Sequence, residues 1–204
     1  GSGSLSGPLS VCDGAVAQYT VSAVPLASHY TWAYSGTGAN FQTTTLLPVN
    51  NIEFTSGATN GTLTVTPGNL CGIGSGSSAV ITVNNRPTAT ISYPSASYCK
   101  STLGTIAVIQ TGTTGGTYSS NGSGLTINTT NGSITPSTSI SGTYTVNYSF
   151  ANGTCSNAVS TSITIRDNPV VTVTANPSIF CTGANSQLQA CLLYTSDAAD
   201  EEDS

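Results

Sequence analysis

Residues 81–91 read Ile-Thr-Val-Asn-Asn-Arg-Pro-Thr-Ala-Thr-Ile, and residues 163–173 read Ile-Thr-Ile-Arg-Asp-Asn-Pro-Val-Val-Thr-Val. The two blocks align without a gap at an offset of 163 − 81 = 82 residues. Each block holds an alternating run, a short polar joint that ends in proline, and a second alternating run. Alternation with period two is typical of a β-strand with one buried face. Proline suits the joint because it donates no N–H to a sheet and stiffens the backbone. The blocks therefore predict repeated β-domains joined near Pro87 and Pro169.

The repeat sets the expected domain boundaries. Residues 8–19 and 177–188 share Pro, Cys, Gly, Ala and Gln at the same spacing, which places a third opening strand after Pro169. We expect a first domain over residues 1–85, a second over 86–168, and the truncated start of a third repeat over 169–190. Residues 191–201 resemble a translated sequencing adapter, so we expect 191–204 to be an artefactual tail outside the fold.

The remaining pattern indicates an all-β fold of tandem immunoglobulin-like β-sandwiches. Short alternating runs are separated by Gly, Asn, Ser and Pro clusters, and no stretch has helical periodicity over ten residues. No apolar run approaches the length of about 18 residues that crosses a membrane, so we expect no membrane span. The expected strands are 18–23, 29–34, 62–66 and 79–83 in the first domain, and 105–109, 125–127, 143–148 and 161–165 in the second.

The expected core includes Trp32, Val65, Tyr144 and Val146. Trp32 occupies the place where immunoglobulin-like sandwiches bury a tryptophan on their third strand. Gly142-Thr143-Tyr144 matches the opening of the strand that carries a tyrosine corner in such folds. The frame Gly61-Thr62-Leu63 holds the same place in the first domain.

Two families of bacterial repeats have similar motifs. Residues 7–85 resemble the PKD-like (polycystic-kidney-disease-like) domains of large Bacteroidota surface and secreted proteins. The matching motifs are Val11-Cys12-Asp13-Gly14, Tyr30-Thr31-Trp32, Gly61-Thr62-Leu63-Thr64-Val65, Asn69-Leu70-Cys71-Gly72 and Ile81-Thr82-Val83-Asn84. Residues 87–166 resemble a companion bacterial Ig-like repeat through Gly124-Leu125-Thr126-Ile127, Asn131-Gly132-Ser133-Ile134-Thr135-Pro136 and Gly142-Thr143-Tyr144-Thr145-Val146. These motifs mark strands and turns, so the resemblance implies a fold and a context and no activity.

Two cysteines fall in each complete domain, Cys12 and Cys71 in the first and Cys99 and Cys155 in the second. This count predicts one disulfide per domain and an oxidising compartment. We favour the pairs Cys12–Cys71 and Cys99–Cys155. Cys12 precedes the second strand of a strict immunoglobulin topology, however, and Cys71 follows the sixth, at the opposite end. A bridge from Cys12 to Cys155 across the joint is therefore the alternative.

Charge and side-chain chemistry exclude most active functions. Residues 1–190 contain three acids and three bases, and all five excess negative charges lie within 197–204, so no basic patch is offered to nucleic acid. His29 is the only histidine, and no acid lies near it in sequence. A zinc site usually has four protein ligands, often from Cys-x-x-Cys pairs and several histidines. This sequence has a single histidine and no Cys-x-x-Cys pair, so we expect no zinc site. The joint at 166–169 holds a single acid, too few for calcium. We therefore expect no catalytic site, no metal and no cofactor.

These observations predict a non-catalytic structural spacer of a large adhesin-like protein, located outside the cell or on its surface. Its expected partners are the neighbouring Ig-like domains of the same chain. Two alternatives are a module that binds glycans or surface proteins, with Tyr30, Trp32 and Tyr34 as the stacking platform, and an accessory segment of a secreted multidomain enzyme.

Overall fold

A computed structural model describes residues 3–43, 46–176 and 187–193. By their contacts, residues Gly1–Ile91, Gln110–Thr117 and Tyr148–Val159 form one compact unit, and Ser92–Ile109, Tyr118–Asn147 and Ser160–Ser204 form another. The segments 110–117 and 148–159 belong to the second sequence repeat, yet they group with the first unit. The repeat boundaries near residues 85 and 168 stay predictions.

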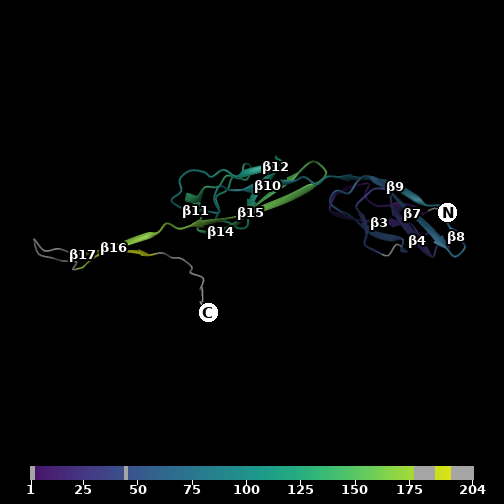
Figure 1. Ribbon diagram of the computed structural model, residues 1–204, viewed down its shortest axis with the longest axis horizontal. Coiled ribbons are helices and arrows are strands. Elements are labelled where there is room, and N and C mark those ends of the chain that lie inside the picture. Colours follow the sequence, from purple (N-terminus) through teal and green to yellow (C-terminus); the bar gives the residue numbers. More distant parts are fainter. Residues whose placement is uncertain (1–2, 44–45, 177–186, 194–204) are drawn as a thin grey trace, which may run out of the picture. The chain divides into compact units, whose positions relative to one another are not determined.

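The first repeat is a sandwich of two sheets (Figure 1). One sheet has the order β1-β3-β6-β5, and the other has the order β2-β9-β7-β4 with β8 added beside β7. This is the strand arrangement of an immunoglobulin-like sandwich, in which the first, second and fifth main strands share one sheet and the third, sixth and seventh share the other. The strands are β1 (Leu5–Ser6), β2 (Ser10–Cys12), β3 (Ala15–Val21), β4 (His29–Tyr34), β5 (Ala39–Phe41), β6 (Val49–Phe54), β7 (Gly61–Asn69), β8 (Gly72–Ile73) and β9 (Ser77–Asn84).

Alternate residues of these strands face the space between the sheets, as a period of two requires. Trp32 on β4 lies opposite Val65 on β7 and is only 4% exposed, while Val65 is fully buried. The buried core comprises Val11, Ala17, Tyr19, Val21, Tyr30, Trp32, Ile52, Phe54, Ala58, Leu63, Val65, Ile81 and Val83. The four strands expected in this repeat all exist, although β3 begins at Ala15 and ends at Val21 rather than spanning 18–23.

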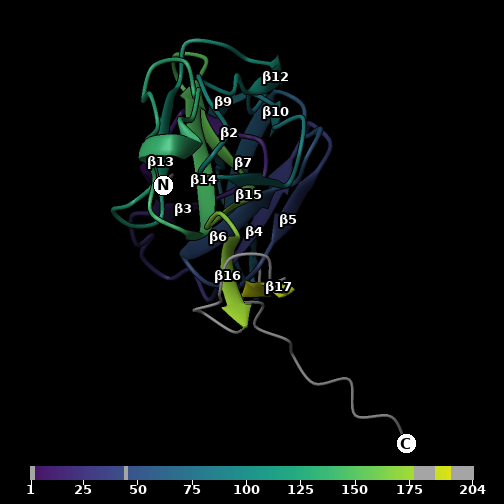
Figure 2. The same cartoon turned by 90° about the vertical axis from the view of Figure 1, so that its left-hand side faces the viewer.

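The second repeat contains a four-stranded sheet with the order β11-β15-β14-β13 and a two-stranded sheet of β10 and β12. Figure 2 shows β10 beside its partner β12. In this order an early strand (β11) pairs with the last strand of its repeat (β15), which pairs with the strand before it (β14), as β2 pairs with β9 and β9 with β7 in the first repeat. Tyr144 and Val146 on β14 are buried. The elements are β10 (Ala89–Ser92), β11 (Ser97–Cys99), β12 (Ile109–Gly112), β13 (Thr117–Ser120), the short 3-10 helix η1 (Pro136–Thr138), β14 (Gly142–Ala151) and β15 (Ser156–Arg166).

The tyrosine corner is present in this repeat. The Tyr144 hydroxyl donates a hydrogen bond of 2.9 Å to the carbonyl oxygen of Ile140, four residues upstream. In immunoglobulin-like folds this bond anchors the chain where it crosses from one sheet to the other. Leu63 holds the matching place in the first repeat as a purely apolar core residue.

Two expected strands of the second repeat are wrong. Residues 105–109 and 125–127 form isolated bridges rather than strands, in which Ile106 and Ile127 each pair with Ile134. Only Ile109 enters a strand, as the first residue of β12. The apolar residues alternate here, but glycines and Asn side-chain turns interrupt the backbone ladder; Asn128, for example, accepts hydrogen bonds from the backbone N–H groups of Thr130 and Asn131.

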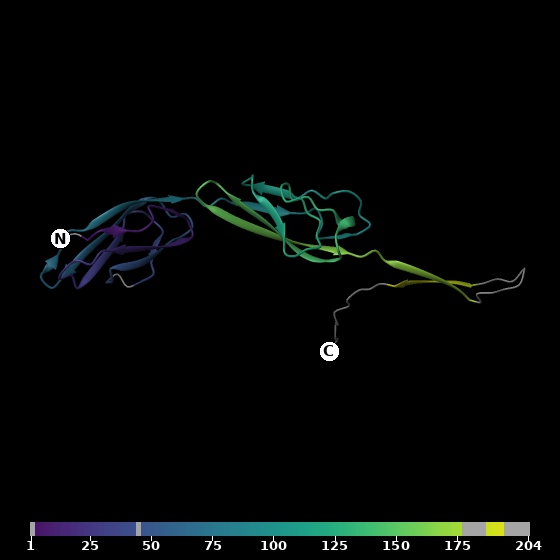
Figure 3. The same cartoon turned by 180° about the vertical axis from the view of Figure 1, so that it is seen from behind.

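Residues after Pro169 form the antiparallel pair β16 (Val170–Asn176) and β17 (Gln187–Leu193), drawn in yellow-green (Figure 3). Thr172 lies opposite Cys191 in this pair. The strand β17 therefore continues three residues into the segment expected to lie outside the fold. Residues 177–186, with Pro177 and Cys181, and residues 194–204 lie outside the described residues.

Candidate functional site: a disulfide-closed joint

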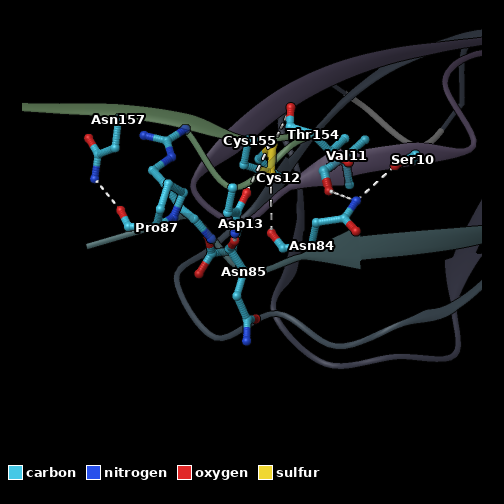
Figure 4. Close-up of a disulfide and its surroundings, with 12 residues drawn as sticks. Ser10, Val11, Cys12, Asp13, Asn84, Asn85, Pro87, Thr154, Cys155 and Asn157 are labelled. Atoms are coloured by element: carbon cyan, nitrogen blue, oxygen red, sulfur yellow. Dashed lines mark hydrogen bonds between the residues drawn. A yellow bond between two sulfur atoms is a disulfide. The ribbon is translucent and has the colours of Figure 1, made fainter. Parts of the chain in front are cut away.

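The joint between the repeats starts from the pairing of β2 with β9. This short parallel ladder puts Ser10, Val11 and Cys12 opposite Thr82, Val83 and Asn84. Asn84 reinforces it, because its side-chain amide donates to the Ser10 hydroxyl at 2.8 Å and to the Val11 carbonyl at 3.2 Å. The opening strand of the first repeat is thereby fixed beside the last residues before the joint (Figure 4).

Asp13 holds the backbone that follows. Its N–H donates to the Asn84 carbonyl at 3.0 Å, and its Oδ1 accepts a 2.7 Å hydrogen bond from the backbone N–H of Arg86. Gly14 then turns the chain from β2 into β3 with φ at +73°, a conformation that side chains rarely adopt. The run Cys12-Asp13-Gly14 is therefore a turn built to hold residues 84–86 of the joint.

The other side of the joint is the turn between β14 and β15. Asn152 and Cys155 close this turn through a hydrogen bond from the Asn152 N–H to the Cys155 carbonyl at 3.0 Å. The Asn152 amide also donates to the Asn85 carbonyl at 2.9 Å, and the Asn157 amide donates to the Pro87 carbonyl at 2.9 Å. Two asparagine side chains thus satisfy carbonyl groups of the joint that no strand partner covers.

A disulfide between Cys12 and Cys155 joins the two sides (Figure 4). Their Cα atoms are 5.8 Å apart, within the range that a disulfide spans. Cys155 is 1% exposed, and its Sγ lies 3.7 Å from the carbonyl oxygen of Asn84. The bond closes a chain segment with a sequence separation of 143 residues. Residues from both repeats therefore make one covalently closed structure within the first compact unit.

The favoured pairs Cys12–Cys71 and Cys99–Cys155 are wrong, and the bridge across the joint is correct. Cys71 and Cys99 carry free thiols. The reason is strand length. Cys12 lies opposite Asn84 at the end of β9, whereas Cys71 lies in the turn before Ser77 at its start. Seven residues of strand separate those ends by about 23 Å, far beyond the reach of a disulfide.

The aromatic residues considered as a sugar platform have other roles. Tyr30 and Trp32 are buried in the core. The Trp32 indole N–H donates to the Leu47 carbonyl at 2.9 Å, and the Tyr34 hydroxyl donates to the Thr59 carbonyl at 2.7 Å. Their ring faces and polar groups are used inside the first sandwich, so this set is not arranged to stack on a sugar.

Burial shapes the acid–base properties of two tyrosines. Burial, with a smaller contribution from Tyr34, raises the pKa of Tyr19 to about 12. Burial, with smaller contributions from Tyr118 and Tyr98, raises the pKa of Tyr93 to about 12. Both phenols stay neutral at physiological pH and donate to backbone carbonyls, Tyr19 to Pro8 and Tyr93 to Gly132. Tyr19 is therefore a hydrogen-bonded core residue, and Tyr93 is a hydrogen-bonded, half-buried one.

The ionisable residues do not converge on one place in the described part of the chain. His29 lies at the start of β4 with its Nδ1 3.3 Å from the Ser28 hydroxyl. Asp167 accepts from the Ser141 hydroxyl at 2.7 Å and forms an ion pair with Lys100 at 3.5 Å. No group of three or more His, Cys, Asp or Glu residues that could hold a metal ion occurs among the described residues. The same described residues contain no helix with the length and apolar character that a membrane crossing requires.

Comparison with solved structures returns proteins built from immunoglobulin domains. The titin domains Z1Z2 in complex with telethonin are 16% identical to this chain, with a TM-score of 0.30, and the match covers 81% of this chain and 97% of that one. The insect immune protein hemolin is 15% identical with a TM-score of 0.38, covering 81% of this chain and 46% of that one. Domains 3–5 of Drosophila OTK are 12% identical with a TM-score of 0.39, covering 81% and 62%.

No curated protein matches the sequence of this chain. A family model described as PKD-like domain matches residues 2–83. That match covers the whole first sandwich, from β1 to the last strand before the joint. The chain is all-β with tandem immunoglobulin-like β-sandwiches, and its first 83 residues are similar to a PKD-like domain.

Proposed function

We propose that this chain is a non-catalytic structural module of an extracellular or cell-surface protein, in which serial sandwiches act as a spacer. The observation that carries the proposal is the disulfide-closed joint between Cys12 and Cys155. In a flexible linker, the backbone N–H and carbonyl groups of residues 84–87 would have no hydrogen-bond partners in the rest of the chain. Here a disulfide and three side chains, those of Asp13, Asn152 and Asn157, hold this short segment.

The same bond supports the proposed location outside the cell. Structural disulfides form and persist where the surroundings are oxidising, as outside the cell. The body of the chain is nearly free of charge, with three acids and three bases up to residue 190. Such a surface offers little electrostatic attraction to substrates or nucleic acid, and it suits a module whose contribution is length and shape.

The wider context is part of the proposal. The motif resemblance favours an adhesin-like surface or secreted protein of Bacteroidota, and the resemblance of residues 191–201 to a translated sequencing adapter favours an artificial origin for the last residues. An accessory segment of a secreted enzyme would have the same joint. Sequencing the gene beyond residue 190 separates these contexts, because a spacer array continues in further repeats and an enzyme continues in a catalytic domain.

Stretching single molecules by their two ends tests the spacer role. When the disulfide is intact, force bypasses the chain between Cys12 and Cys155. Reduction should then release about 500 Å of extra contour length, from 143 residues at about 3.5 Å each. The matched control is the Cys12→Ser, Cys155→Ser variant, which should show the long extension under both oxidising and reducing conditions. A chain that extends without a resolved unfolding force in both redox states would contradict a mechanical role as a spacer. A consistent hit in a glycan-array screen would favour the binding alternative.

A further inference from the structure

The two free cysteines occupy places that correspond to the bonded pair. Cys99 ends β11, and β11 pairs in parallel with β15 so that Ser97, Tyr98 and Cys99 lie opposite Thr164, Ile165 and Arg166. Cys12 ends β2, and β2 pairs in parallel with β9 at Thr82, Val83 and Asn84. The partner residues differ by 166 − 84 = 82, the repeat offset seen in the sequence. Cys99 is therefore the structural counterpart of Cys12.

The backbone around the two residues repeats as well. The N–H of Asp13, after Cys12, donates to the Asn84 carbonyl at 3.0 Å. The N–H of Lys100, after Cys99, donates to the Arg166 carbonyl at 2.9 Å. Both bonds hold the cysteine at the end of the closing strand, next to the Pro-bearing joint that follows. Cys99 therefore lies beside the strand end that leads into the joint at Pro169, just as Cys12 lies beside the strand end that leads into the joint at Pro87.

Cys71 corresponds in the same way to Cys155. Cys71 lies in the turn between β7 and β8, on the connection from β7 to β9, and Cys155 lies in the turn between β14 and β15. An asparagine amide holds each turn, since the Asn69 Oδ1 accepts from the Cys71 N–H at 2.9 Å and the Asn152 Oδ1 accepts from the Cys155 N–H at 3.3 Å. The turn of the first repeat is wider, but it joins the equivalent strands.

Among the described residues, Cys71 and three large apolar side chains near it in sequence or space are exposed. Leu26, Leu70 and Ile73 are 87%, 105% and 81% exposed. Leu26 also adopts a φ of +66°, which is unfavourable for a leucine. Leu26 and Ile73 line a shallow hollow together with Cys71. By contrast, Cys155, whose partner is in place, is 1% exposed. An exposed thiol among exposed apolar side chains has the chemistry of a surface that could dock another domain.

We propose that successive repeats are joined by a ladder of disulfides, each linking the opening-strand cysteine of one repeat to the turn cysteine of the next. Cys12–Cys155 is the first rung. Cys99 takes the turn cysteine of a following repeat, and Cys71 takes the opening-strand cysteine of a preceding one. Each rung forms when two thiols lose two protons and two electrons to a disulfide oxidant, such as oxidised glutathione, which becomes two thiols. The ladder does not depend on the spacer role, so the two proposals fail in separate experiments.

Two copies of the chain can form one such rung, because Cys99 of one copy and Cys71 of another are the two halves of the proposed pair. Both proteins carry Cys181→Ser and Cys191→Ser. One also carries Cys71→Ser and keeps the Cys99 thiol, and the other also carries Cys99→Ser and keeps the Cys71 thiol. The two proteins are mixed in equal amounts in a glutathione redox buffer, and the dimers are quantified by non-reducing mass spectrometry with peptide mapping. Retention of the Cys12–Cys155 bond in each protein shows that it is folded.

Random pairing would give twice as much mixed dimer as either homodimer. The ladder predicts a mixed Cys99–Cys71 dimer at least about tenfold above that ratio, since docking favours the complementary surfaces by a factor that corresponds to about 1.4 kcal/mol. The control moves the thiol along the same strand, by Ser97→Cys in the Cys71→Ser, Cys99→Ser protein, and should return the ratio to random. A random ratio with Cys99, a preference for homodimers, the absence of dimers, or an equal bias from the Ser97→Cys protein would overturn the proposal.

Discussion

Reduction of the Cys12–Cys155 bond should lower the free energy of unfolding by an amount set by the length of chain that it closes. The sequence separation is 143 residues. In the chain-entropy description a loop of this length restricts the unfolded ensemble by about 5 kcal/mol at 25 °C. The native contacts of Asn152 and Asn157 with the joint do not require the bond, so the reduced protein should still fold. The effect should therefore appear in stability and not in the secondary structure of the folded state.

The assay compares oxidised and reduced forms of one sequence, which avoids a cavity or a new hydroxyl at the buried Cys155. Cys71, Cys99, Cys181 and Cys191 are replaced by serine to prevent exchange. Guanidinium unfolding is followed by the fluorescence of Trp32, the only tryptophan, which reports on the first sandwich, and by circular dichroism, which reports on the whole chain. Oxidised and reduced Cys12→Ser, Cys155→Ser protein is the control and should show no difference.

The expected loss is about 5 kcal/mol summed over the transitions of the residues between the two cysteines. If the two repeats unfold separately, each transition shifts by a part of that sum. A total loss below about 1 kcal/mol would refute the reasoning, because a bond of this span cannot be formed in the native state and leave the unfolded chain unrestricted.

Three further changes have defined outcomes. Asn50 is fully buried, and its side-chain amide has no hydrogen-bond partner in the described residues. Asn50→Leu should therefore raise the free energy of unfolding by about 1–2 kcal/mol in denaturant titrations, whereas Asn40→Leu, at an exposed site of β5, should change it little. A lower free energy of unfolding for Asn50→Leu would show that the Asn50 amide is hydrogen-bonded. Tyr144→Phe should cost about 1 kcal/mol through loss of the hydrogen bond to Ile140, and an unchanged thermal midpoint would deny the tyrosine corner a stabilising role. The pKa values of Tyr19 and Tyr93 are raised to about 12, so the unfolded chain releases these protons first. Stability that is complete below pH 10 should therefore fall between pH 10 and 12. Ultraviolet titration should show a group of phenols that ionise late, and full ionisation near pH 10 in the folded protein would contradict the raised pKa values.

Local alternation of apolar and polar residues predicted most of the strands, because successive side chains of a strand point to opposite faces of its sheet. The run 29–34 alternates apolar and polar residues, and β4 has those bounds. Trp32, Val65, Tyr144 and Val146 were expected in the core, Trp32 and Tyr144 through their match to immunoglobulin-like positions, and all four are buried. Pattern failed at 105–109 and 125–127, where the apolar residues alternate but the backbone ladder is broken, since hydrogen bonding between distant segments is not visible in local order.

The site shows the same division between local and long-range information. The sequence by itself determined the 82-residue repeat, the Pro-bearing joints and the presence of two cysteines per repeat, because each of these is a property of residue order and spacing. It did not determine which cysteines bond. Only the tertiary structure decided that, because the parallel register of β2 on β9 carries Cys12 to the far end of the strand from Cys71 and brings it to Cys155. A disulfide forms between cysteines whose Cα atoms the fold places about 6 Å apart, whatever their separation along the chain.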